Sequence, residues 1–152
     1  FAEQLLLWGM RMWAQAFNQG ANNYEILDKG FTLAGVRDAH DALDDIMSIF
    51  ATSGQGVINI NCPQCECITI DENRIMGAVA AWQKEADPSR GNIYIRSWLP
   101  AAALRIMCKP ACQLAEILNQ GDLNISSRNL ANEFQFKDEK FISNHSMVQY
   151  IK

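Results

Sequence analysis

Residues 2–18 read AEQLLLWGMRMWAQAFN, and this stretch decides the fold class. Leu6, Met10, Trp13 and Phe17 follow one another at intervals of three or four residues, which places them on one face of an α-helix. The polar residues of the stretch form only a narrow stripe on the opposite side. The pattern therefore predicts a helix that needs cover around nearly its whole circumference.

Leu7 and Trp8 flank that polar stripe closely, because successive residues are turned by 100° around a helix. One core face cannot bury them together with the residues opposite, so we expect them to form an interface. The simplest such interface joins two copies of the chain. We therefore expect self-association, as a homodimer or another homo-oligomer, or contact with a different protein through Leu7 and Trp8.

Helical spacing recurs along the chain and predicts further helices over about residues 24–34, 39–50, 72–86 and 101–118. Thr69 with Glu72, or Asp71 alone, can cap the third of these. Residues 92–99 fit either a short strand or a short helix, and the helical surroundings favour a helix. Pro110 is expected to kink the last helix or to restart it.

Residues 57–61 alternate between apolar and polar side chains, and Ile68-Thr69-Ile70 repeats the alternation after a turn that contains three cysteines. This pattern predicts a two-stranded hairpin. The expected fold class is mainly α: a small helical bundle of five to six helices with a short β-hairpin insertion near residues 57–70.

Residues 1–121 are expected to form one α-rich globular domain, because 152 residues suffice for a single core. Residues 122–152 form a polar C-terminal tail without sustained periodicity, and we expect it to be weakly structured or to dock on the core or on another chain. From this composition we also expect that truncation after Gly121 leaves the midpoint of thermal unfolding nearly unchanged.

The charge balance bears on partners and location. The net charge of −4 and the absence of a basic stripe argue against nucleic-acid binding. The basic residues are scattered, and the apolar stretch Leu5–Met12 is too short to span a bilayer, so membrane association is not expected. Five cysteines in two clusters do not resemble a secreted disulfide scaffold, which favours a reducing, cytoplasmic location.

The cysteines near residue 65 suggest a metal site. Cys62-Pro63-Gln64-Cys65 is a turn that can present two thiolates to one ion, and Cys67 follows two residues on. Cys108 and Cys112 could complete the ligand set if the fold brings them close, with zinc or an iron–sulfur cluster as the bound group. The alternative is that these thiols are half-buried apolar residues, in which case no cofactor is expected.

Cys112 supports a further alternative. If Pro110 begins a new helix, Cys112 lies in its first turn, where the helix dipole favours the thiolate and thiol-redox chemistry. The competing interpretation is a small core residue beside Cys108.

Features of the common enzyme classes are few. His40 and Asp44 stand four residues apart and could orient an imidazole, although acidic residues early in a helix more often complement its dipole. The chain has two histidines and lacks a nucleophile elbow, a phosphate loop and an H-E-x-x-H motif. We therefore expect a non-enzymatic, intracellular protein-interaction or regulatory domain, with the cysteine-ligated metal protein and the thiol-redox protein as alternatives.

Overall fold

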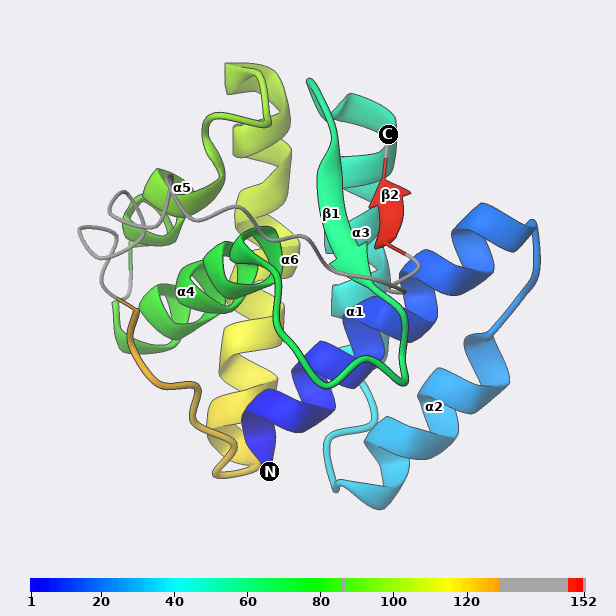
Figure 1. Cartoon of the computed structure of the whole chain (residues 1–152). Coiled ribbons are helices and arrows are strands. Elements are labelled where there is room, and N and C mark those ends of the chain that lie inside the picture. Colours follow the sequence, from blue (N-terminus) through cyan, green and yellow to red (C-terminus); the bar gives the residue numbers. More distant parts are fainter. Residues whose placement is uncertain (86, 129–147, 152) are drawn as a thin grey trace.

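A computed structural model describes residues 1–85, 87–128 and 148–151. Within these residues it contains six helices and two short strands (Figure 1). In chain order they are α1 (Ala2–Gln19), α2 (Tyr24–Leu33), α3 (Ala39–Ser53), β1 (Ile58–Asn61), α4 (Ile70–Lys84), α5 (Ser89–Ile95), α6 (Ala101–Gln120) and β2 (Val148–Ile151). The mainly α helical bundle predicted from periodicity is confirmed.

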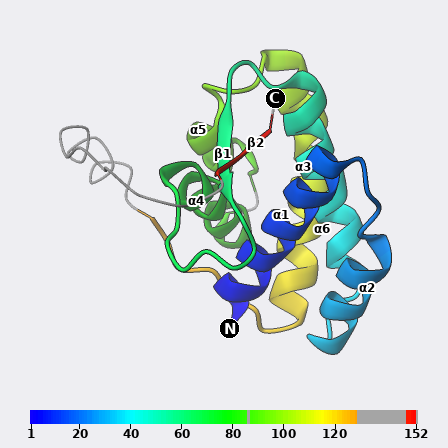
Figure 2. The same cartoon turned by 45° about the vertical axis from the view of Figure 1, so that its right-hand side comes forward.

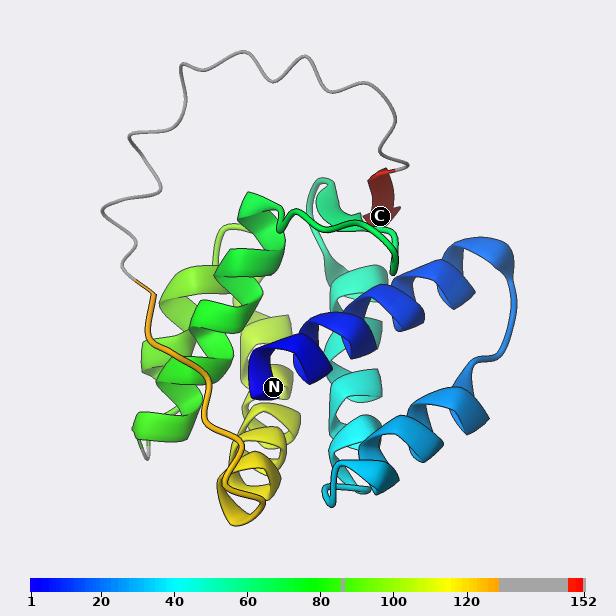
Figure 3. The ribbon, with the colours of Figure 1, turned by 60° about the horizontal axis from the view of Figure 1, so that its bottom comes forward.

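The core forms where the long helices meet. α6 packs against both α3 and α4, and α1 runs across the bundle in contact with α2, α3 and α4 (Figure 3). Leu6 and Met10 of α1 are fully buried, as are Phe31 of α2 and Phe50 of α3. The core thus covers Leu6, Met10 and Trp13 of the face predicted for the first helix, whereas Phe17 of that face is 47% exposed.

Two ambiguous segments are helical, one of them only in part. α5 covers Ser89–Ile95, so the first half of the 92–99 stretch is helical and residues 96–99 form a turn and a bend. α6 is one continuous helix of 20 residues, and Pro110 lies inside it. The expectation that Pro110 could begin a new helix is therefore wrong, and Cys112 lies in the interior of α6, away from any N-terminal turn.

The predicted hairpin is wrong in its second strand. β1 pairs antiparallel with β2, with Ile58 opposite Ile151 and Asn61 opposite Val148 (Figure 2). Residues 68–70 are not a strand, because Thr69 is the N-cap of α4 and forms a capping box with Glu72. The capping hydrogen bonds commit this segment to the helix, and the C-terminal strand takes its place beside β1.

Both described parts of the tail pack on the helices. Leu123, Ile125 and Ile151 are buried in the hydrophobic core. The Gln83 side chain donates to the Leu123 carbonyl and accepts from the Ile125 N–H, at 2.8 Å in each case. The rest of the predicted tail, residues 129–147 and 152, lies outside the described residues.

An ion pair joins the start of α1 to the segment after α6. Arg128 Nη1 lies 2.7 Å from Glu3 Oε1, and the Ser126 N–H donates to the same oxygen at 3.0 Å. The Arg128 side chain, partly opposed by desolvation, lowers the pKa of Glu3 to about 2. A carboxylate with a lowered pKa stabilises the fold above its unfolded pKa, and that contribution is lost as the pH falls towards its folded pKa.

We predict that Glu3→Gln flattens the acid limb of the stability curve. In the wild type, the Glu3 contribution should be complete above about pH 5 and should disappear between pH 4.5 and pH 2. Because 37% of the Glu3 side chain is exposed, solvent screens the pair, and the loss at neutral pH should be only about 1 kcal/mol. Urea unfolding from pH 7 to pH 2 measures this, and identical slopes for both proteins would contradict it.

Candidate functional site

Two features of the described residues stand out as candidate sites: a disulfide loop between β1 and α4, and an aromatic pocket at the junction of α1, α2 and α3. Cys62 and Cys65 form the disulfide, with their Cα atoms 5.5 Å apart. Cys62 directly follows β1, and its carbonyl accepts a hydrogen bond from the Cys65 N–H at 3.1 Å, which closes a turn. Both cysteines are half-buried, whereas Cys67 is a free, exposed thiol.

A buried ion pair lies beneath this loop. Arg11 of α1 contacts Glu72 of α4 through Nε–Oε1 at 2.8 Å and Nη2–Oε2 at 3.0 Å. Arg11 is 3% exposed and Glu72 is fully buried. Removing two charges from water is costly, and the cost is offset only when the remaining donors and acceptors are also satisfied.

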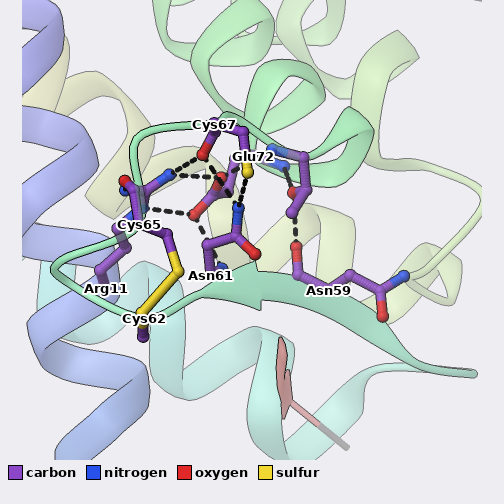
Figure 4. A network of polar contacts seen from close by, with 8 residues as sticks. Arg11, Asn59, Asn61, Cys62, Cys65, Cys67 and Glu72 are labelled. Carbon is purple, nitrogen blue, oxygen red and sulfur yellow. Dashed lines mark hydrogen bonds and ion pairs between the residues drawn. A yellow bond between two sulfur atoms is a disulfide. The ribbon is translucent and has the colours of Figure 1, made fainter. Parts of the chain in front are cut away.

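Those remaining groups are satisfied by the loop itself (Figure 4). Arg11 also donates to the carbonyl oxygens of Cys65 and Cys67, at 2.5 and 2.6 Å. Glu72 accepts from the backbone N–H groups of Asn61 and Thr69, at 3.0 and 2.8 Å. The ion pair therefore fixes the backbone of the cysteine loop against α1 and α4.

Asn61 attaches Cys67 to the same network. Its side-chain amide donates to the Cys67 carbonyl at 2.9 Å and lies 3.3 Å from the Cys67 sulfur. Cys67 thus differs from the disulfide pair both in redox state and in surroundings.

The predicted five-cysteine metal set is not assembled in this structure. Cys62 and Cys65 are bonded to each other, and Cys108 and Cys112 lie one turn apart on α6. Among the residues that the structure describes, no group of three or more His, Cys, Asp or Glu side chains could hold a metal ion. Metal binding by the reduced cysteines stays a prediction, which elemental analysis of protein purified under reducing conditions would test.

The aromatic pocket, of about 350 Å³, opens where the end of α1 meets the starts of α2 and α3. Trp13 and Phe17 of α1 stack with ring centroids 5.1 Å apart, and Tyr24 of α2 lies edge-on to His40 of α3 at 4.7 Å. Trp13 Nε1 donates to Asp44 Oδ1 at 2.6 Å. The pocket thus combines aromatic surfaces with one carboxylate.

His40 forms the inner part of this pocket and is 3% exposed. Its Nδ1 lies 2.8 Å from the Arg37 carbonyl, which can only accept, so Nδ1 carries the hydrogen. Nε2 lies 3.2 Å from Asp41 Oδ1, but the orientation does not allow a hydrogen bond, and Nε2 has no other partner among the described residues. The His40–Asp44 spacing noted in the sequence therefore brings both residues to one pocket, without a bond between them.

Leu7 and Trp8, the predicted interface residues, are half-buried and pack against the core of their own chain. The Trp8 ring lies 6.3 Å from that of Phe31 and covers Gly30 so closely that a Cβ atom at Gly30 would overlap it. α2 therefore covers much of the surface that the helix periodicity left without a partner. Self-association through Leu7 and Trp8 stays a prediction.

Neither the Arg11–Glu72 pair nor the aromatic pocket was predicted from the sequence. One indication of the pair was available, since Arg11 is a single charge inside an otherwise apolar helical stretch, where an unpaired cation is rarely tolerated.

In the described residues no helix is long and apolar enough to cross a membrane. The chain matches no protein-family model, no curated protein and no solved structure.

Proposed function

We propose that the chain is a small non-enzymatic interaction domain that binds a basic segment of a partner protein. In this proposal, the aromatic pocket receives a lysine or arginine side chain of the partner. The observation that carries the proposal is the grouping of Trp13, Phe17 and Tyr24 around a pocket with Asp44 in its wall. Its volume falls in the range typical of ligand sites.

The aromatic rings favour a cation. The face of an indole, phenol or phenyl ring carries partial negative charge and attracts an ammonium or guanidinium group. Phe17 and Tyr24 are 47% and 50% exposed, so an incoming side chain can reach them from solvent. Arginine and lysine also carry apolar stems that would lie along these rings.

The charges around the pocket favour the same occupant. The described residues that line it include Asp44 but no Lys or Arg. Asp41, whose Oδ1 lies 3.2 Å from Nε2 of the pocket residue His40, is also exposed on α3, and the whole chain carries a net charge of −4. Complementary charge mainly speeds association and selects among partners, while contact with the rings supplies most of the affinity.

Titration with a short lysine-rich peptide, followed by amide chemical shifts, tests the proposal. We expect shifts around the pocket and about fivefold weaker binding for Phe17→Ala, which removes one ring of the stacked wall. Asp44→Asn should weaken binding to a similar extent, because it removes the charge but keeps an oxygen to accept from Trp13. A glutamate-rich peptide of equal length should not bind.

Leu33→Ala is the matched control, since Leu33 is 86% exposed on α2 and does not line the pocket. This variant should bind the peptide as the wild type does. Shifts spread over the whole acidic surface, with Phe17→Ala binding normally, would mean attraction by net charge alone and would contradict the proposal. Light scattering during the titration identifies a second copy of the chain as the partner if dimers form through the pocket.

A further inference from the structure

Three cysteines within six residues occur in two chemical states. Cys62 and Cys65 form a disulfide, while Cys67 remains a free thiol. The disulfide closes a ring with only two residues between its cysteines, and the stabilisation from a cross-link decreases as the closed loop becomes shorter. This disulfide is therefore expected to contribute little to the stability of the fold.

The loop is already held by contacts that do not involve sulfur. Arg11 binds the carbonyl groups of Cys65 and Cys67, and Glu72 binds the backbone N–H groups of Asn61 and Thr69 on either side. Figure 4 shows these contacts on the inner side of the loop, with the disulfide near its outer turn. None of these contacts involves a sulfur atom, so none of them requires the S–S bond.

We propose that Cys62–Cys65 is a reversible redox site that exchanges electrons with thiols and disulfides, either of low molecular weight or on another protein. Both cysteines are only half-buried, so an external thiolate can reach a sulfur atom. Because the Arg11–Glu72 network keeps the backbone of the loop in place, the two thiols of the reduced form stay close enough to pair again. This proposal concerns a different part of the molecule from the aromatic pocket and does not depend on it.

The exchange proceeds in two balanced steps. An external thiolate attacks one sulfur of the pair, which forms a mixed disulfide and releases the other cysteine as a thiolate that takes a proton from water. A second external thiolate then attacks the external sulfur of the mixed disulfide and releases the remaining cysteine. Two electrons pass from two external thiols to the cysteine pair, and the external product is a disulfide.

Equilibration of the full chain with glutathione buffers tests the site. After each mixture of reduced and oxidised glutathione, free thiols are trapped with N-ethylmaleimide under denaturing conditions, and the adducts are counted by intact mass. The protein has five cysteines, of which three are free when the pair is oxidised. We expect the count to fall from five to three within the buffer series and to return to five when reduced glutathione is restored.

Two variants locate the change. Cys62→Ser should give four adducts in every buffer, whereas Cys67→Ser should change from four to two with its midpoint within about twofold of the wild-type glutathione ratio. Fragmentation of the peptide that contains residues 62–67 assigns the bonded pair even if one variant folds poorly. Three adducts in every buffer would mean an inert structural disulfide, and five adducts in every buffer would mean no pair. Either result, or loss of the transition in Cys67→Ser, overturns the proposal.

Discussion

Replacing Arg11 with Met is expected to lower the free energy of unfolding by about 3–5 kcal/mol. The substitution keeps an apolar stem of similar length but leaves the carboxylate of Glu72 fully buried without its cation. It also removes the donors to the Cys65 and Cys67 carbonyls, so the cysteine loop should loosen. Denaturant unfolding at neutral pH measures the loss, and hydrogen exchange in residues 61–72 measures the loosening.

Arg37→Met provides the matched control. Arg37 forms an ion pair with Asp28 at the same 2.8 Å distance, but 66% of the Arg37 side chain is exposed. A solvent-exposed pair contributes little, so this substitution should leave the free energy of unfolding almost unchanged. Equal losses for the two variants would contradict the view that burial makes the Arg11–Glu72 pair indispensable.

Truncation after Gly121 is expected to destabilise the protein by roughly 5 kcal/mol or more, which is comparable with the total stability of many small domains. The truncated chain lacks Leu123, Ile125 and Ile151, each of which is buried in the core. It also lacks β2, so β1 becomes an unpaired strand. The composition of the tail alone predicted an unchanged melting curve for this truncation, which is the opposite of the result expected from the structure.

An intermediate truncation after Arg128 separates the contributions of the two tail segments. That chain retains Leu123, Ile125 and the Arg128–Glu3 ion pair but lacks β2. We expect its free energy of unfolding to be lower than that of the full chain by about 2–3 kcal/mol, the value for one buried Ile side chain with some lost strand pairing. Thermal or urea unfolding should therefore show that the full chain is the most stable, the chain ending at Arg128 is less stable, and the chain ending at Gly121 is the least stable. A chain ending at Gly121 that melts like the full chain would refute both values.

Local patterns predicted the helices because the information that defines a helix lies within a few residues. Leu6, Met10 and Trp13 identified α1 through their spacing, and the structure buries all three. Thr69 with Glu72 was one of two caps predicted for the next helix, and this capping box is the one present at the start of α4. Apolar spacing and capping act over one or two turns, so they can be recognised before the tertiary fold is known.

The partner of β1 could not be predicted in the same way. Alternation showed that residues 57–61 are suited to a strand, and β1 covers four of them. The strand opposite begins at Val148, far along the chain from the predicted partner, Ile68-Thr69-Ile70. Strand alternation shows which face of a strand is buried but carries no information about which distant segment completes the sheet.

By itself, the amino-acid sequence determined the class of this protein, the positions of its helices and the clustering of Cys62, Cys65 and Cys67, since all of these depend on neighbours along the chain. Only the tertiary structure decided which groups meet across it. Arg11 pairs with Glu72 across 61 positions, and the aromatic pocket takes its walls from three helices. The physical reason is that a buried charge or an open pocket depends on how whole helices pack together, and that packing minimises the free energy of the entire core rather than of any single segment.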